Sequence, residues 1–417
     1  MNDREKENGM KKVCMVVVEH PFQDARVFRK EAKSLQKKGY QVTMIVPRKQ
    51  GYLFGVDGTP YKKHYLNKVF TYEGIKIVTY HAESCKHHLS KVLKDASVWD
   101  QAFQNPLTQL ALKENADVYH VHEYLSLFAG VGIKRKMLEH KGKKVKLIYD
   151  SHELTPDPLS ERYPEATKKN LYEKLLLMLD EVDQIITVSD SIKQWYQSKK
   201  PTVPVEVIYN SPPLTDYTPA NTKVTDRLTV CFEGNLSNRK GNWEKIKAIS
   251  ELCAKEMPFQ FKILGGTRFN EHLEIPSHLV DVITFTGWVD YAHIHEHMKD
   301  VHIGWIDSDG LDASLNERYA MPNKFFSYLT NGVPVVVNES DDLAAFLEKY
   351  RCGTVIHKKQ ASAEDYRDAF LQLYNDSQML NQLSENARRI MEVSFCWGRM
   401  EDRLLAVYRS LLNEEVK

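Results

Sequence analysis

Short apolar runs alternate with amphipathic stretches along most of the chain. The first run is residues 11–18, KKVCMVVV; a helical pattern over 27–38 follows, and a second run lies at 40–46 after Gly39. This order predicts a βαβ unit, and strands so rich in apolar residues are typical of a buried parallel sheet. More strands of the same kind are predicted downstream, with helices between them, at 117–122, 144–150, 184–189 and 205–210.

A second alternating series begins after residues 211–226, which are rich in Pro, Thr and Asp and have the composition of a linker. It predicts a helix from Trp243, one that ends at Lys299, one after Pro322, and helical structure from about 362 to 415. The strands predicted in this series start at Leu228 and continue at 259–266, 283–289, 301–307, 333–338 and 353–358. The least regular part, residues 47–110, is interpreted as a hairpin or insertion with a helix near 89–103.

Two successive doubly wound α/β domains are the simplest architecture for this pattern. A chain of 417 residues is also too long for one typical core. The predicted boundaries are 1–212 for the N-terminal Rossmann-like domain, 213–227 for the linker, 228–395 for the C-terminal Rossmann-like domain, and 396–417 for a last helix.

Composition and cysteine spacing indicate the cellular compartment of the protein. No apolar run is long enough for a membrane span, and the polar start MNDREKENGMKK has no signal-peptide core. The six cysteines form no C-x-x-C pair, which favours reduced thiols over a disulfide frame or a zinc site. These features predict a cytoplasmic protein.

Charge is distributed unevenly although the whole chain has a net charge of only +1. Residues 1–210 contain 34 Lys and Arg against 26 Asp and Glu, a net +8, while the remainder contains 23 against 30, a net −7. A basic N-terminal half is suited to anionic lipid or an anionic acceptor, with solvated surface lysine as the alternative. No nucleic-acid-binding motif accompanies the charge, so nucleic acid is not an expected partner.

Residues 317–336, ERYAMPNKFFSYLTNGVPVV, place an acid, a Pro-bounded loop, a short amphipathic helix and an apolar strand in succession. A helix N-terminus offers unpaired N–H groups and a positive dipole end, so this loop is a candidate anion site. Glu317 just before it is suited to sugar hydroxyls. An ordinary loop, helix and strand is the alternative interpretation.

Glycines end several strands of the second half. FEGNLSNRKG (232–241) follows its first strand and includes Lys240, which could neutralise phosphate; ILGG (263–266) and TGWV (286–289) follow later strands. Glycine there lets a ligand approach the backbone at the strand ends where such sheets bind ligands. Simple turns are the alternative for each.

Histidines mark two strand ends of the first half. His120 and His122 lie in YHVHE on one face of their strand, and His152 follows the next strand in YDSHEL. Such residues suit hydroxyl binding or proton transfer, with a structural role as the alternative. A metal site is not expected, because H-V-H has no convincing third ligand in the sequence.

Together these motifs resemble glycosyltransferase family 4, the retaining enzymes of GT-B fold. DARVFRKEAKSL, DVYHVHE and YDSHEL are similar to its N-terminal motifs, and EGNLSNRKG resembles its phosphate loop. MPNKFFSYLTNGVPVV is the most specific match and resembles bacterial polysaccharide transferases. The resemblance implies two Rossmann-like domains facing a cleft, with the last helix crossing back to the first domain.

The resemblance also implies a role for particular residues. His152, Glu317 and Lys240 would be catalytic, with Lys240 on the donor diphosphate and Glu317 on sugar hydroxyls. The implied donor-binding residues are Gly234, Asn235, Arg239, Gly265, Trp288, Val289, Met321, Pro322, Asn323, Lys324 and Ser327. Those implied on the acceptor side are His20, Arg26 and His122.

Three positions depart from the family pattern. Asn235 replaces the phosphate-loop arginine, a loss for which Arg239 is a candidate replacement. Ser327 stands where the family's second acid usually binds ribose, and a serine offers only one short hydroxyl. The family's acid spacing would put Tyr319, rather than Glu317, at the first acidic position.

The function implied is metal-independent, retaining transfer of a sugar from a nucleotide donor, with UDP as the expected nucleotide, to a glycan or lipid-linked acceptor in cell-surface polysaccharide synthesis. Residues 126–146 mix apolar positions with seven Lys or Arg and predict peripheral binding to anionic membrane at the inner face of the plasma membrane. The alternatives are a nucleotide-sugar 2-epimerase and a non-catalytic sugar-binding or scaffold protein. The pattern leaves the oligomeric state open.

Overall fold

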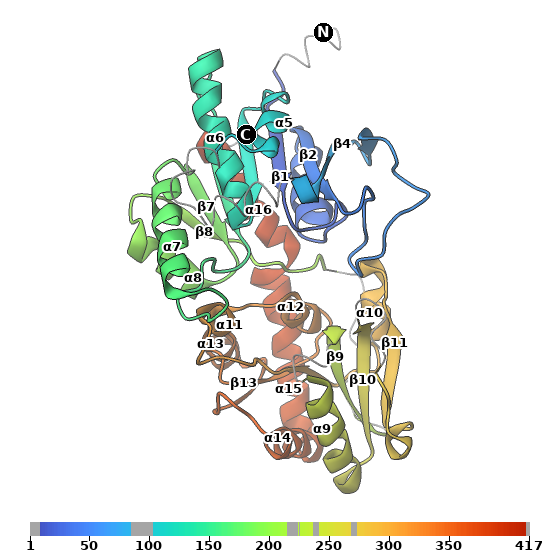
Figure 1. The fold of residues 1–417 in the computed structure, drawn as a ribbon. Helices are drawn as coiled ribbons and strands as arrows, with labels where there is room; N and C mark the ends of the chain where they lie inside the picture. Colours follow the sequence, from blue (N-terminus) through green and yellow to red (C-terminus); the bar gives the residue numbers. More distant parts are fainter. Residues whose placement is uncertain are drawn as a thin grey trace. The chain divides into compact units, whose positions relative to one another are not determined.

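The computed structural model of the protein describes residues 9–84, 103–214, 224, 226–236, 242–267 and 273–413. The chain forms two compact units, shown with their elements in Figure 1. The first runs to Ile208 and includes the C-terminal segment from Glu401; the second is Tyr209–Met400. Within the described residues, no helix has the length and apolar content that crossing a membrane requires.

The first unit is built on an eight-stranded sheet in the order β3-β4-β2-β1-β5-β6-β7-β8. All neighbours pair in parallel except β3 and β4, which form the predicted hairpin. The strands are β1 (Lys12–Val17), β2 (Gln41–Arg48), β3 (Val69–Tyr72), β4 (Ile75–His81), β5 (Val118–His122), β6 (Lys146–Ser151), β7 (Gln184–Thr187) and β8 (Val205–Val207).

Helices connect these parallel strands. The helix predicted after β1 is a π-helical turn η1 (Val27–Ala32) that continues into α2 (Lys33–Lys37). The remaining helices are α5 (Pro106–Leu112), α6 (Tyr124–Lys141), α7 (Glu165–Leu179) and α8 (Asp190–Lys199). Most of the helix predicted near 89–103 lies outside the described residues.

The second unit has a six-stranded, all-parallel sheet in the order β11-β10-β9-β12-β13-β14. Its central strands are buried, and Trp305 lies fully buried in the core between Phe261 and Tyr366. The strands are β9 (Leu228–Leu236), β10 (Phe259–Thr267), β11 (Ile283–Gly287), β12 (Ile303–Ile306), β13 (Val335–Asn338) and β14 (Gly353–Ile356).

The helices of the second unit match the prediction except before β12. There the helix predicted to end at Lys299 consists of η5 (Tyr291–His293) followed directly by α10 (Ile294–His297), and a short turn, η4 (Ser277–Leu279), precedes β11. The others are α9 (Asn242–Glu256), α11 (Leu315–Tyr319), α12 (Asn323–Thr330), α13 (Asp341–Tyr350), α14 (Ala363–Asn375), α15 (Ser377–Ile390), η6 (Met391–Phe395) and α16 (Trp397–Leu412).

Strand order places a switch point in each sheet, where the chain changes the direction in which it adds strands. In the first unit it lies between β1 and β5, and in the second between β9 and β12. Ligands of doubly wound folds bind outside the carboxyl ends of the strands at this point. The predicted histidine motifs and the predicted phosphate motifs therefore lie at the two switch points.

The end of α16 belongs to the first unit, since that unit includes the chain from Glu401. Tyr408 is fully buried there, its hydroxyl 3.0 Å from His120 Nδ1 and its ring 5.6 Å from that of Tyr40. The last helix therefore joins the N-terminal fold, as the family resemblance implied.

Candidate active site

The ends of β9 and β10 come close together at two glycines. Gly234 and Gly265 are paired across the two strands and have φ values of +124° and +130°. A Cβ atom on Gly265 would lie 2.2 Å from the carbonyl oxygen of Gly234. Only glycine fits there, so both residues keep the carboxyl end of the sheet open to a ligand.

Helix α12 begins beside this glycine pair. Pro322 is its N-cap residue, and no side chain caps the first turn, so its amide groups keep their capacity to bind an anion. Lys324 Nζ lies 3.9 Å from the centroid of the Phe232 ring and 3.9 Å from the position of a Cβ atom on Gly234. The start of α12 thus presents N–H groups and an ammonium group at one place on the sheet edge.

Two neighbours fix the first turn of α12. Asn323 is exposed, and its Oδ1 accepts a hydrogen bond of 2.5 Å from Asn210 Nδ2. Met321, just before the N-cap, is 5% exposed and packs inside the unit. Because Met321 is buried, only its backbone is placed for contact with a ligand.

Ser327, on the next turn of α12, is buried and lies near the carboxylate of Glu233. Burial raises the pKa of Glu233 to about 7, although the Ser327 hydroxyl and the charge of Lys324 both act to lower it. The backbone of Glu233 donates to the Tyr328 hydroxyl, which in turn donates to the Cys231 carbonyl. Sequence reasoning missed Glu233; the signal was an acid directly before the strand-end glycine in FEGNL.

The other predicted donor-side residues are spread along the same unit. Trp288 is 41% exposed, and its Nε1 donates to the Thr267 carbonyl at 3.1 Å, beside Gly266. Val289 is half-buried after it, and Asn235 is half-buried at the end of β9. Arg239 and Lys240 lie outside the described residues.

Glu317 is exposed on α11, where Ser314 Oγ caps the helix by accepting from the Glu317 backbone N–H. The next residue, Arg318, is paired with Asp341 of α13. These contacts fix α11, but they do not place the Glu317 carboxylate against β9 or α12. Its implied contact with donor hydroxyls therefore stays a prediction.

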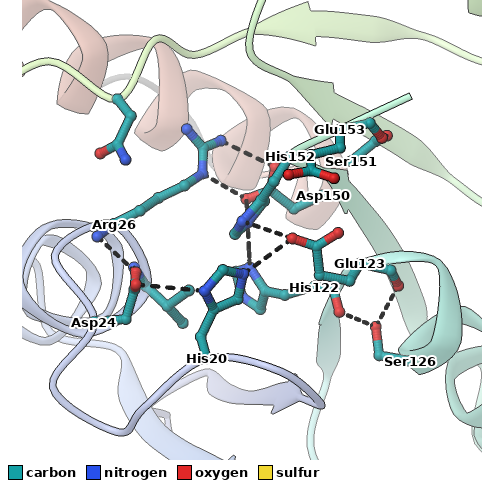
Figure 2. A network of polar contacts seen from close by, with 12 residues as sticks. His20, Asp24, Arg26, His122, Glu123, Ser126, Asp150, Ser151, His152 and Glu153 are labelled. Carbon is teal, nitrogen blue, oxygen red and sulfur yellow. Dashed lines mark hydrogen bonds and ion pairs between the residues drawn. The ribbon is translucent and has the colours of Figure 1, made fainter. Parts of the chain in front are cut away.

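At the switch point of the first unit, a polar network joins the ends of β1, β5 and β6 (Figure 2). Glu123 Oε1 lies 3.0 Å from His20 Nε2 and 3.1 Å from His152 Nδ1, so it bridges the two rings. His152 Nε2 lies 3.2 Å from Asp150 Oδ2 and 3.2 Å from His122 Nδ1. At the other end, His20 Nδ1 lies 3.5 Å from Asp24.

Backbone conformation supports a special role for Glu123. It is the N-cap residue of α6 and has φ +74° and ψ 159°, a region occupied almost only by glycine. Such strain persists only where the surroundings hold it, and it gathers at functional sites. Here the strain turns the carboxylate toward His20 and His152.

The network alternates positive and negative charges. Burial alone would lower the pKa of His152, but Asp150 and Glu123 outweigh it and raise the value to about 9. The pKa of His20 is raised as well, because Asp24 and Glu123 outweigh its burial. Burial opposes ionisation of Glu123, yet both histidines hold its pKa down to about 2. At neutral pH, His20 and His152 are therefore imidazolium groups.

His122 differs from these two rings. It is fully buried, and burial lowers its pKa to about 4 in spite of the adjacent Asp150, so it is neutral. Its ring stacks on that of His120 at 4.4 Å, as expected for two residues on one face of a strand. With no exposed surface, His122 contacts His152 from within the unit, and its place on the acceptor side stays a prediction.

Arg26 is buried as well, and its place on the acceptor side also stays a prediction. It is 2% exposed and donates to both oxygens of Asp150 and to the Ile208 carbonyl, while its Nε lies 3.0 Å from Glu31. A guanidinium group with these partners holds the network in place. Of the three predicted acceptor-side residues, only His20 has substantial exposed surface.

Metal-ligating groups do gather here, contrary to the expectation that H-V-H lacks a third ligand. Glu31 and Asp150 lie beside His120 and His122, and a second group joins His20, Glu123 and His152. The acids come from distant parts of the chain, so spacing could not reveal them. Since Arg26 already binds Asp150 and Glu31, its guanidinium competes with any cation for the first group.

Comparison with known proteins identifies the class. Glycosyltransferase Family 4 matches residues 25–212, and Glycosyl transferases group 1 matches residues 215–390. Sucrose-phosphate synthase from Thermosynechococcus elongatus has a similar structure, with a TM-score of 0.66 at 14% identity, over 97% of this chain and all of that one. HepE from Anabaena, in a complex with UDP and glucose, gives 0.65 at 14% identity, over 96% and 100%.

These likenesses define the fold as GT-B, and both matching models describe glycosyltransferase domains. The chain belongs to glycosyltransferase family 4. Among its relatives, Spore coat protein SA of Bacillus subtilis (strain 168) is 24% identical over 257 residues. That match covers 56% of this chain and 66%, just under two thirds, of the relative.

Proposed function

We propose that the protein transfers a sugar, with retention of configuration, from a UDP-sugar to a glycan or lipid-linked acceptor. The observation that carries the donor assignment is the start of α12 beside the close pair of strand-end glycines. Uncapped amides, a helix dipole and the Lys324 ammonium converge on one place, which suits a diphosphate. Lys240, and with it Arg239, would add cations from the adjoining loop.

Uridine as the base is supported from outside the chain, by the UDP bound to the structurally similar HepE. Within the chain, Trp288 gives a partly exposed aromatic surface beside Gly266. Gly265 and Val289 border the same strand ends. These residues form the proposed base-binding edge.

The charge state of His152 bears on the chemical step. An imidazolium group with a pKa near 9 can donate a hydrogen bond to a sugar hydroxyl, but it cannot take a proton at neutral pH. We therefore assign the acceptor's proton to the departing diphosphate. The bond between the sugar carbon and the diphosphate oxygen breaks, the acceptor oxygen bonds to that carbon, and its proton passes to the diphosphate.

Cations of the protein replace a metal ion in this proposal. Lys324, with Lys240 and Arg239, would neutralise the leaving diphosphate, the role that divalent ions fill in other transferases. Turnover should then be insensitive to a chelator such as EDTA. A requirement for a divalent ion would remove this part of the proposal.

We assign the proposed membrane contact mainly to charge. Most apolar residues of α6 are buried within the unit and are not available for insertion into lipid, with Leu138, 52% exposed, as the main exception. Lys134, Arg135 and Lys143 form ion pairs with acids of the same unit. The proposed contact with an anionic membrane, where a lipid-linked acceptor would reside, is therefore electrostatic and weak.

The function is tested with a panel of UDP-, GDP-, ADP- and dTDP-sugars, by measuring nucleotide release from purified protein with and without candidate acceptors. We expect release from a UDP-sugar, and a product whose anomeric proton coupling in NMR matches that of the donor. An inverted product would contradict retention. Conversion of the free nucleotide-sugar into its 2-epimer would favour the epimerase, and binding without release would favour a non-catalytic sugar-binding protein, which the departures at Asn235 and Ser327 would explain.

A further inference from the structure

Glu233 is an acid at the switch point of the second unit that the proposed chemistry leaves unused. It lies on β9 directly before Gly234, and β9 adjoins β12 on the side where the strand order reverses. The carboxyl end of such a strand faces ligands. Any group there that is not satisfied by the protein is a candidate for binding one.

One oxygen of this carboxylate is not satisfied. Glu233 Oε2 is buried and has no hydrogen-bond partner among the described residues. A buried acceptor left unpaired destabilises the folded protein, so this oxygen is a candidate to bind a hydrogen-bond donor of a ligand. Asn235 Oδ1, two residues along the same face of β9, is a second buried oxygen without a partner in the described structure.

The rest of the Glu233 environment holds the carboxylate in place. Ser327 of α12 lies near enough to the carboxylate to lower its pKa, and the Glu233 backbone N–H donates to the Tyr328 hydroxyl at 2.7 Å. Tyr328 is fully buried and packs against Gly304, where a Cβ atom would lie 2.4 Å from its ring. The unpaired Oε2 atom of Glu233 is therefore held in a defined position as a hydrogen-bond acceptor.

The position of this acceptor selects the chemistry of its partner. It lies one residue from Gly234, over which Lys324 and the start of α12 offer the proposed phosphate site. In a nucleoside diphosphate, the group next to the phosphates is the ribose, whose vicinal hydroxyls are hydrogen-bond donors. A carboxylate accepts from such a pair better than a serine hydroxyl, which has one short oxygen.

We propose that Glu233 accepts hydrogen bonds from the ribose hydroxyls of the donor nucleotide, with Ser327 orienting its carboxylate. This inference rests on the proposed function. It assigns ribose binding to Glu233 on β9. It also explains why Ser327 can occupy the position on α12 where an acid was expected. The acid is supplied from β9, beside the Ser327 hydroxyl.

The state of the carboxylate gives the proposal a pH signature. Burial raises the pKa of Glu233 to about 7 in the free protein. Hydroxyl donors stabilise the charged form, so ribose binding lowers that pKa and releases a proton. Affinity for UDP should then be full above pH 7 and should fall as the pH drops below it. Glu233→Gln should keep only the part of this dependence that comes from titration of the UDP phosphate at about pH 6.

The test compares UDP with 2′-deoxy-UDP by calorimetry, on wild type, Glu233→Gln and the surface control Glu256→Gln. We expect wild type and control to bind UDP about ten-fold more tightly than the deoxy analogue, the scale of one charged hydrogen bond. Glu233→Gln should bind the deoxy analogue as before but lose most of the preference. The unchanged analogue shows that this variant is folded.

A swapped variant provides a second readout. Glu233→Ala with Ser327→Glu returns a carboxylate to the same space from α12, and we expect it to recover part of the preference that Glu233→Ala alone loses. An undiminished ribose preference in Glu233→Gln would overturn this inference while leaving UDP binding, and the proposed function, intact. If wild type binds no ribonucleoside diphosphate, both the donor assignment and this inference are contradicted.

Discussion

Replacing Glu123 with glutamine tests the electrostatic account of the histidine network. Two carboxylates, those of Asp150 and Glu123, raise the pKa of His152 from 6.5 to about 9 against the opposing effect of its burial. That shift corresponds to about 3 kcal/mol of preference for the charged ring. Asp150 raises the pKa of His152 more than Glu123 does. Removing the Glu123 charge should therefore remove less than half of what the two carboxylates together contribute. We expect the pKa of His152 to fall by about 1 in Glu123→Gln.

Stability should follow the same shift. A histidine whose pKa is raised on folding stabilises the protein fully below its unfolded pKa near 6.5, and the effect is lost as the pH rises through about 9. Wild type should therefore lose free energy of unfolding between pH 7 and 9.5 more steeply than Glu123→Gln. The exposed neighbour Glu153→Gln is the matched control and should behave like wild type.

The assay is a titration of histidine ring signals by NMR, assigned with a His152→Gln variant, together with urea unfolding at several pH values. His152 should show no titration near pH 6.5 in wild type. A wild-type ring that titrates there, or a variant whose stability has the same pH dependence as wild type, would refute the charge-balanced network.

Three other changes test separate parts of the structure. Gly265→Ala should destabilise the second unit by roughly 2–5 kcal/mol and abolish UDP binding, because its Cβ would lie 2.2 Å from a carbonyl oxygen and the residue has φ +130°. The control Gly266→Ala makes only ordinary contacts at 3.7 Å and should be tolerated. Equal unfolding midpoints of the two variants in urea would contradict this prediction. Glu123→Gly should be about 1 kcal/mol more stable than Glu123→Ala in urea unfolding, because the backbone strain that glycine relieves at φ +74° exceeds the larger entropy that glycine loses on folding. A less stable glycine variant would show that this backbone conformation is not strained. Flotation with phosphatidylserine vesicles should occur at low salt and disappear at high salt, and no flotation at any salt would end the membrane proposal.

The fold was predictable because its signals are local. Buried parallel strands appear as apolar runs, and Gly39 and the Pro-rich stretch mark where elements end. The helix predicted to end at Lys299 is short and ends at His297, as η5 and α10. Local pattern does not show how far tertiary contacts let a helix extend.

The sites were predictable only in part, for the same physical reason. The motifs at His152 and Pro322 could be found because each occupies one short segment. The network around His152 needs Asp24, Glu123 and Asp150, which the sheet brings together from three strand ends. Arg26 and His122 were predicted on the acceptor side, and their burial depends on packing that spacing cannot reveal. The role of Glu233 was missed because the motif FEGNL was interpreted only through its glycine.

The central claim is that the start of α12 binds the donor diphosphate. The most direct measurement is the rate of UDP release from the UDP-sugar that the wild type uses, compared with Lys324→Ala and with the surface control Lys349→Ala. Loss of one charged contact of about 1.5–3 kcal/mol predicts a decrease of ten-fold or more for Lys324→Ala and none for the control. Equal release rates in all three proteins, or no release from any nucleotide-sugar by wild type, would contradict the account.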